Sequence, residues 1–172
     1  MKLTDDKISL RALEPTDIDV MYRWENDAEL WRYGSTVAPF SRKQIWEYIA
    51  GYDADIYSAR QLRLMIVDNA SGEAVGAIDI TDYDPANQRA AIGIFVDRSY
   101  QRRGFASAAI RLVEGYCAER LGIHQLWAIV PGDNTPSRSL FASSGYKVSG
   151  RLQSWLKTRT SFCDAYVYQH FI

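Results

Sequence analysis

The chain has 172 residues, a formal net charge of −1 and a hydrophobic content of 47%. This length fits one ordinary domain, residues 1–172, which can bury a core without disulfides or a metal. The near-neutral charge disfavours a dedicated nucleic-acid binder, because such proteins carry a marked basic excess. No apolar run approaches the ~20 residues that span a bilayer, and the first residues lack the apolar segment of a signal peptide. We therefore expect a cytoplasmic protein with no nucleic-acid or membrane partner.

The two cysteines and the two histidines indicate no metal site. Cys117 falls in a helix pattern and Cys163 in a strand pattern, so neither a zinc framework nor a redox pair is indicated. We interpret both cysteines as small buried hydrophobic residues. His124 and His170 have no Glu or Cys at ligand spacing. We therefore expect no metal.

The first half of the chain predicts a strand, two helices and a three-stranded meander. Residues 7–13 alternate with period two, which is typical of a strand. A helix start follows at 14–17, and Ser41 with Gln44 forms a capping box before a second helix. Strand patterns separated by turn signals then cover residues 61–68, 74–83 and 88–97.

The second half of the chain alternates between helix and strand patterns. A helix pattern runs from about residue 104 to residue 121 and ends at Gly122, which acts as a left-handed terminator. An apolar strand covers 124–130, and Asn134-Thr135-Pro136 opens another helix. The chain finishes with two strands, at 147–155 and 162–171. This order of elements predicts an α/β domain with a mixed sheet.

The junction between residues 95 and 106 is the most informative segment of the sequence. An apolar strand runs through Gln101-Arg102-Arg103-Gly104 into the long helix. Gly104 lets backbone amides approach an anion closely, and the helix dipole places about half a positive charge at that end. Arg102 and Arg103 add positive charge, so the junction predicts a pyrophosphate site. The alternative is a tight connection with two solvated arginines.

Two segments carry a family resemblance. Gln101-x-x-Gly104-x-Ala106, directly after an apolar strand, resembles the acetyl-CoA loop of the GNAT family of N-acetyltransferases. Residues 134–146, in which Asn134 begins a helix and a Gly-Tyr pair ends it, resemble the second recognisable segment of that family. The arrangement most resembles the branch that contains spermidine acetyltransferases and the acetyltransferases of ribosomal-protein amino termini. The resemblance implies the GNAT fold: a mixed, mostly antiparallel sheet of about seven strands, flanked by about four helices.

The resemblance also implies acetyl-CoA as the co-substrate and assigns residues to it. The strand is implied to pair with the pantetheine arm through the backbone of Ile94, Phe95 and Val96, so it must splay from its neighbour. The pyrophosphate is implied to lie on the loop and helix start, at Gln101, Arg102, Arg103, Gly104, Phe105, Ala106 and Ser107. The pantetheine and acetyl end is implied to contact Asn134, Ser137 and Phe141. Asn134 can serve as a plain N-cap at the same time.

The chain lacks the usual general acid of the family. In many members a Tyr seven residues after the Asn protonates the departing sulfur, but Phe141 occupies that position here. Ser137 lies one turn earlier on the same helix face, and we hypothesise that it partly replaces the tyrosine as the catalytic residue. The alternative is a first-turn serine that satisfies a backbone amide. Tyr146 is a weaker candidate, because its place after Gly145 usually marks a core aromatic residue.

The general base is left open by the sequence. An acceptor ammonium with a pKa of ~10.4 loses a proton at pH 7 at a cost of about 4.6 kcal/mol, so a base or a water chain is useful. Relatives often carry a carboxylate on the strand before the loop, where this chain has Ala91. The alternative candidates for a base or an acceptor anchor are Asp79, Asp82, Glu25 and Glu29. The aromatic side chains that would wall an acceptor groove are Trp24, Trp31, Tyr33, Tyr83, Trp127 and Trp155.

We therefore interpret the chain as an acetyl-CoA-dependent N-acetyltransferase that transfers the acetyl group directly, in a ternary complex. The acceptor is a primary amine, either a small-molecule amine or polyamine or the amino terminus of a peptide or protein. Cys117 is excluded as a covalent carrier, because it falls on the inward face of a helix. The alternatives are a CoA-binding sensor or adaptor with little activity and, third, a structural subunit that binds neither substrate. A homodimer is the assembly that the resemblance suggests.

Overall fold

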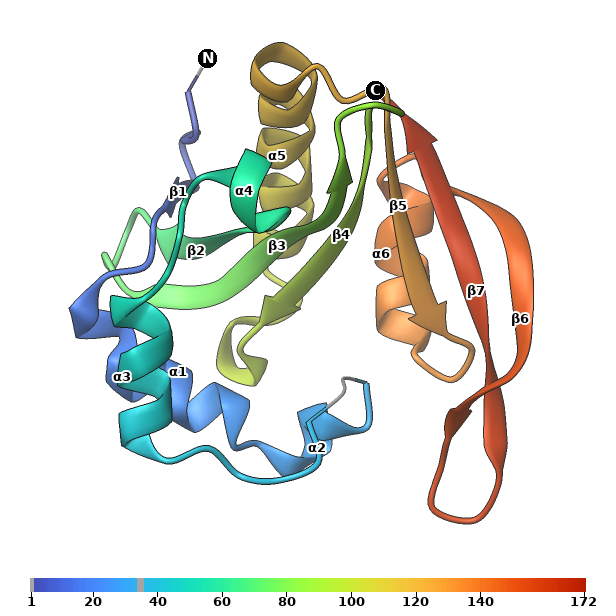
Figure 1. Ribbon diagram of the computed structural model, residues 1–172, viewed down its shortest axis with the longest axis horizontal. Coiled ribbons are helices and arrows are strands. Elements are labelled where there is room, and N and C mark those ends of the chain that lie inside the picture. The colour runs from blue at the N-terminus through green and yellow to red at the C-terminus, as the bar shows by residue number, and fades with distance from the viewer. Residues whose placement is uncertain (1, 34–35) are drawn as a thin grey trace.

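A computed structural model describes residues 2–33 and 36–172. Within these ranges, seven strands form one sheet in the order β1-β2-β3-β4-β5-β7-β6 (Figure 1). Neighbouring strands are antiparallel except for β4 and β5, which run parallel. The predicted mixed, mostly antiparallel sheet is therefore confirmed. The strands are β1 (Ile8–Arg11), β2 (Leu62–Asp68), β3 (Ala74–Asp84), β4 (Arg89–Val96), β5 (Gln125–Pro131), β6 (Lys147–Lys157) and β7 (Phe162–Phe171).

Six α-helices occur in the described ranges, and two of them are single turns of four residues. The four longer helices are those that the sequence patterns predict. The two single turns, α2 and α4, carry too few residues to show a helical period in the sequence. None of the described helices is long and apolar enough to cross a membrane. The helices are α1 (Ile18–Glu25), α2 (Ala28–Trp31), α3 (Arg42–Ala50), α4 (Ile56–Ala59), α5 (Phe105–Leu121) and α6 (Thr135–Ser143).

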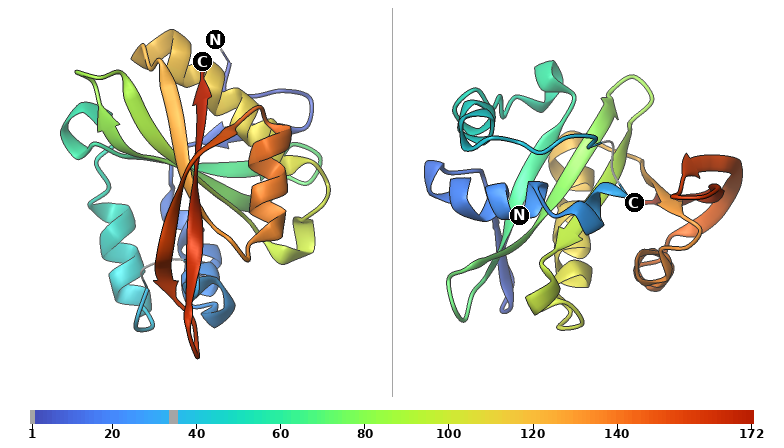
Figure 2. Two further views of the ribbon diagram at one scale, coloured as in Figure 1. Left: turned by 90° about the vertical axis from the view of Figure 1, so that its right-hand side faces the viewer. Right: turned by 90° about the horizontal axis from the view of Figure 1, so that it is seen from below.

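The helices cover the two faces of the sheet. Ala77 and Ile78 are neighbours on β3 and therefore point to opposite faces. Ile78 belongs to the main core, which α5 and α6 share, whereas Ala77 packs with Trp24 of α1 in a second cluster. The views in Figure 2 show α5 and α6 on one side of the sheet and α3 on the other. The sheet therefore separates a helix-packed core from a face that α1 and α3 only partly cover.

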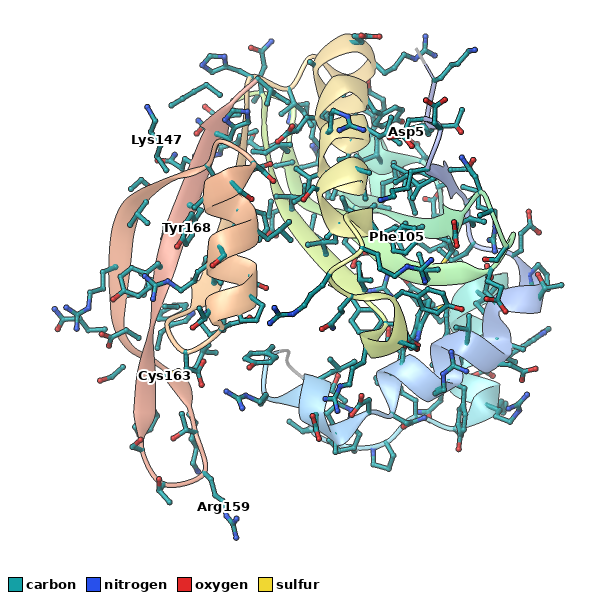
Figure 3. The ribbon with its side chains drawn as sticks, turned by 180° about the vertical axis from the view of Figure 1, so that it is seen from behind. Asp5, Phe105, Lys147, Arg159, Cys163 and Tyr168 are labelled. Carbon is teal, nitrogen blue, oxygen red and sulfur yellow. The ribbon has the colours of Figure 1, made fainter. Side chains whose placement is uncertain are left out.

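The two cysteines differ in their surroundings. Cys117 is fully buried on α5, and burial raises the pKa of its thiol to about 12. Cys163 is only half-buried, because it lies near the turn of the β6–β7 hairpin. The predicted burial is therefore correct for Cys117 and wrong for Cys163. Figure 3 labels Cys163 on the hairpin, well away from α5.

β4 and β5 separate after a short paired stretch. Their register covers only Arg89↔Gln125, Ala90↔Leu126 and Ala91↔Trp127. β4 continues to Val96 along β3, and β5 continues to Pro131 along β7. Figure 1 shows the two strands diverging toward their carboxyl ends. This is the predicted splay, and it leaves the β5-facing edge of residues 92–96 without a strand partner among the described residues.

Candidate functional site

A groove with a volume of about 2100 Å³ runs along the splayed end of β4 and over the sheet face beside α1. β4, the turn before α5, the start of α6 and the α1–α2 region all contribute to its wall. Segments far apart in the sequence therefore meet in this groove. Of the residues that the resemblance assigned to the co-substrate, those that line it are Ile94, Phe95, Val96, Gln101, Arg102, Gly104, Phe105, Ala106, Ser107, Asn134 and Ser137.

The turn before α5 has the geometry of an anion site. Arg102 and Gly104 both adopt left-handed backbone conformations, with φ angles of 59° and 80°. Gly104 is the N-cap of α5 and offers no side-chain cap, and the first bond of the helix runs from the Ala108 amide to the Gly104 carbonyl. The amides of residues 105–107 therefore have no acceptor among the described residues. Unsatisfied amides at the positive end of a helix dipole favour a phosphate group.

The side chains around this turn have different roles. Arg102 forms no ion pair with any described residue, so its charge is available to a ligand. Gln101 is occupied, because its Nε2 donates to the Val96 carbonyl at 3.0 Å. Arg103 does not line the groove; its guanidinium lies 4.9 Å from the ring centre of Phe105 and 3.8 Å from Asp68 Oδ2. Arg102 is therefore the arginine of the pair that faces the groove.

α6 lines the groove with one face and packs against the core with another. Asn134 Oδ1 accepts the Ser137 amide at 3.2 Å, so the N-cap role of Asn134 is confirmed. The hydroxyl of Ser137 forms no hydrogen bond with the described residues, which differs from the alternative of a serine that satisfies a backbone amide. Phe141 is only 4% exposed, packs against Tyr146 with 5.0 Å between ring centres, and does not line the groove. The sequence analysis placed Ser137 and Phe141 on one face of this helix. In the structure, Ser137 lines the groove, whereas Phe141 packs in the core.

Tyr146 belongs to the core. Its side chain is 3% exposed, and burial raises its pKa well above the usual range. Its hydroxyl forms no hydrogen bond among the described residues, and it does not line the groove. The position after Gly145 therefore marks a core aromatic residue, as its sequence context indicated.

Only some of the aromatic residues and carboxylates that the sequence analysis proposed for the acceptor side line the groove. Trp24, Trp31 and Tyr33 line the groove. Tyr83 is buried and Trp155 is 55% exposed. Trp127 and Asp82 line a separate cavity of about 420 Å³. Of the four candidate carboxylates from the sequence analysis, the three that line the groove are Glu25, Glu29 and Asp79.

An arginine that the sequence analysis did not single out joins two of these carboxylates. Arg63 on β2 donates through Nε and Nη2 to both oxygens of Asp79, at 2.7 and 3.0 Å. Its Nη1 donates to Glu25 Oε1 at 3.0 Å. Although burial lowers the pKa of Arg63, its hydrogen bonds to Asp79 raise it above its usual value. The available signal was the position of Arg63 among the apolar residues of the strand pattern at 61–68.

Asp97 ties the end of β4 to α1. Its carboxylate accepts hydrogen bonds from Trp24 Nε1 at 2.7 Å and from the Ser99 amide at 3.0 Å. Burial raises the pKa of Asp97, but the bonds from Ser99 and Trp24 outweigh it and lower the pKa to about 2. This contact fixes the α1 side of the groove to the strand that leads into the anion site.

Among residues 2–33 and 36–172, no three His, Cys, Asp or Glu side chains cluster in a way that would hold a metal ion. The groove offers hydrogen-bond donors, acceptors and charges. It combines an anion site at a helix start, an unpaired strand edge and a partly acidic wall.

Comparisons with known proteins agree with this architecture. A family model described as an acetyltransferase (GNAT) domain matches residues 7–147. The sequence is 27% identical over 167 residues to the uncharacterized N-acetyltransferase p20 of Bacillus licheniformis, covering 96% of this chain and 93% of that protein. It is 26% identical over 145 residues to spermidine N(1)-acetyltransferase of Escherichia coli K12, covering 84% of this chain and 75% of that protein.

A solved structure extends the agreement to the fold. The structure of RimL, a ribosomal L7/L12 alpha-N-protein acetyltransferase in complex with coenzyme A, matches with a TM-score of 0.85 at 18% identity. The match covers 98% of this chain and 96% of that chain. Because the family model spans most of the chain and the fold agrees throughout, the chain belongs to the GNAT family and is an N-acetyltransferase.

Proposed function

We propose that the enzyme uses acetyl-CoA as its donor and acetylates a primary amine directly, in a ternary complex of enzyme, donor and acceptor. The observation that carries this proposal is the splay of β4 and β5 beside the unsatisfied amides of α5. The amides suit a pyrophosphate, and the unpaired strand edge suits an extended pantetheine arm. Two of the proteins named above act, by their names, on spermidine and on a ribosomal protein, which supports an amine acceptor of one of these kinds.

The residues that line the groove fit coenzyme A. The backbone edge of residues 94–96 offers hydrogen-bonding groups along one strand, as in the addition of a strand to a sheet. The amides of residues 105–107 and the side chain of Arg102 face the phosphate end. Asn134 and Ser137 line the same groove from α6. We therefore assign the donor to this end of the groove.

Acetyl-CoA supplies a thioester, so the overall reaction converts an ammonium ion and acetyl-CoA into an N-acetyl amine, free coenzyme A thiol and one proton. A C–N bond forms, the C–S bond breaks, one amine proton leaves to solvent and another ends on the thiol. Phe141 has no ionisable group, so it supplies no proton to the sulfur. The Ser137 hydroxyl is half-buried and without a partner among the described residues, and we assign it a hydrogen bond to the thioester. A positioned proton donor contributes about 10² to 10⁴-fold to a rate.

Cofactor binding and turnover test the proposal separately. Calorimetry with acetyl-CoA measures donor binding, and release of the coenzyme A thiol measures transfer to an amine panel of spermidine, L-alaninamide, L-alanine and peptides that start with Ser or Ala. We expect tight donor binding and transfer to at least one amine. Tight binding without transfer across the panel would instead support a CoA-binding sensor.

Ser137→Ala tests the hydrogen bond that we assign to Ser137 at the thioester. We expect kcat to fall at least tenfold while the Kd for acetyl-CoA changes little. Ser149→Ala is the matched control, because Ser149 is exposed on β6 and does not line the groove. Unchanged kcat in Ser137→Ala would remove Ser137 from the mechanism. Light scattering of the same samples tests the homodimer that the family resemblance suggests.

A further inference from the structure

The cluster of Glu25, Arg63 and Asp79 carries one uncompensated negative charge in the groove. Asp79 engages both of its oxygens with Arg63, at 2.7 and 3.0 Å, so this pair is neutral. Glu25 joins the cluster through Oε1 alone, 3.0 Å from Arg63 Nη1. Its second oxygen, Oε2, has no partner among residues 2–33 and 36–172. The cluster therefore presents one carboxylate oxygen with hydrogen-bonding capacity left over.

The surrounding residues hold this cluster in place. The Tyr48 ring of α3 lies 5.8 Å from the Arg63 guanidinium, and the Tyr52 hydroxyl accepts the Arg63 backbone amide. The Arg63 and Glu25 side chains are only 25% and 32% exposed. Charges that are mostly shielded from water interact more strongly and are less screened by salt. A carboxylate held in this way suits a charge-assisted hydrogen bond from an ammonium group.

The cluster flanks the strand that the proposed function gives to the donor. Arg63, Asp79 and Gly93 are register partners across β2, β3 and β4. Gly93 lines the groove and immediately precedes the 94–96 edge. Since Gly93 has no side chain, no side chain of β4 separates the cluster from the groove at this position. A side chain at residue 93 would contact the cluster, because an added Cβ would lie 3.9 Å from Asp79 Cβ. An acceptor bound at Glu25 therefore lies on the α1 face beside the donor strand.

Among residues 2–33 and 36–172, the α1 side of the groove offers no unpaired arginine to a carboxylate. Among the described residues, the arginines that line this side all pair with acidic side chains. Arg102 lies at the other end, in the anion site. The pairs are Arg11–Asp17, Arg23–Asp97, Arg32–Asp133, Arg63–Asp79 and Arg98–Glu29.

We infer that Glu25 binds the ammonium group of the acceptor, that Arg63 and Asp79 position Glu25, and that the acceptor carries no carboxylate next to its amine. This inference rests on the proposed function. It selects the amino terminus of a peptide or an alkylamine over a free amino acid. A free amino acid would place its carboxylate among acids and arginines that are already paired, which costs desolvation without a compensating ion pair.

Matched acceptors test the selectivity. The wild-type enzyme is assayed with L-alanine and L-alaninamide, and with spermidine, by release of the coenzyme A thiol. Rates are expressed per neutral amine, because the pKa values of the two alanine compounds differ. We expect kcat/KM for alaninamide to exceed that for alanine at least tenfold. Equal values, or a preference for alanine, would overturn the inferred selectivity.

Matched variants test the residues. Glu25→Gln keeps the shape of the side chain and is expected to raise the KM of the best acceptor at least tenfold, with a smaller change in kcat and an unchanged Kd for acetyl-CoA. Asp79→Asn leaves Glu25 and Arg63 as a neutral pair and is expected to raise the same KM. Glu47→Gln is the control, because Glu47 is exposed on α3, pairs with Lys43 and does not line the groove.

The outcomes separate the two proposals. A wild-type enzyme that binds acetyl-CoA and acetylates no amine of the panel contradicts the proposed function itself. An active enzyme whose acceptor KM changes less than twofold in Glu25→Gln contradicts only the role of Glu25. A raised acceptor KM in Glu25→Gln and Asp79→Asn, with Glu47→Gln unchanged, supports the inference.

Discussion

Replacing Asp97 with asparagine is expected to destabilise the fold by about 2 kcal/mol at pH 7. The Asp97 carboxylate accepts hydrogen bonds from Trp24 Nε1 and from Ser99, and it lies 3.3 Å from Arg23 Nη2. These contacts lower its pKa from 3.8 to about 2. The difference between the folded and unfolded pKa values corresponds to about 2 kcal/mol at neutral pH. An asparagine amide loses the ionic contacts, so this stabilisation disappears.

The pH dependence gives the sharper test. Because the folded pKa of Asp97 lies below the unfolded value, its stabilisation is fully present above about pH 4 and is lost as the pH falls toward 2. The free energies of unfolding of the wild type and of Asp97→Asn should therefore differ at pH 7 and converge at low pH. For a chain of this size, 2 kcal/mol corresponds to a Tm about 4–8 °C lower.

Urea denaturation at pH 7, 5 and 3, followed by tryptophan fluorescence, measures these free energies. Asp6→Asn is the control, because Asp6 is exposed and its side chain forms no hydrogen bond with the described residues. A difference between wild type and Asp97→Asn below about 0.5 kcal/mol at pH 7 would refute the reasoning. A difference of the same size at every pH would show that it does not come from ionisation of Asp97.

Further predictions concern the helix starts and the buried thiol. Gly104→Ala places a side chain at φ 80° with its Cβ 3.2 Å from Lys7 Nζ, so we expect a loss of about 1–2 kcal/mol in unfolding free energy and weaker acetyl-CoA binding by calorimetry. Asn134→Ala removes the α6 cap and should cost about 1 kcal/mol in thermal unfolding, whereas Asn134→Asp keeps a cap oxygen and should recover most of it. Cys117→Ala should retain its kcat, because a buried thiol with a pKa of about 12 is no nucleophile near neutral pH. A folded Cys117→Ala enzyme without turnover would contradict direct transfer.

The geometry of the turn before α5 was predictable because its signals are local. Gly104 supplies the left-handed turn, and the apolar residues on either side specify a strand and a helix that meet at that turn. Asn134 and Gly122 are also recognisable from short patterns, since a cap or a terminator acts within one helical turn. The order of these elements further indicated a mixed sheet, and the family resemblance implied its splay.

The acceptor side of the groove was less predictable because its contacts are long-range. Glu25 and Arg63 are 38 positions apart, and Trp24 and Asp97 are 73 apart. Sequence reasoning could name Glu25 and Asp79 as candidates but could not find Arg63 between them. Their meeting depends on the register of β2 with β3 and on how α1 crosses the sheet.

The sequence by itself determined the seven strands, the four longer helices, their order and the glycine turn before α5, because these follow from local backbone preferences and from hydrophobic periodicity. Only the tertiary structure decided which side chains face the groove. It directs Ser137 into the groove and Phe141 into the core, turns Arg103 toward Asp68, and leaves one oxygen of Glu25 without a partner among the described residues. These outcomes depend on packing and on pairing between distant segments, which a local pattern does not encode.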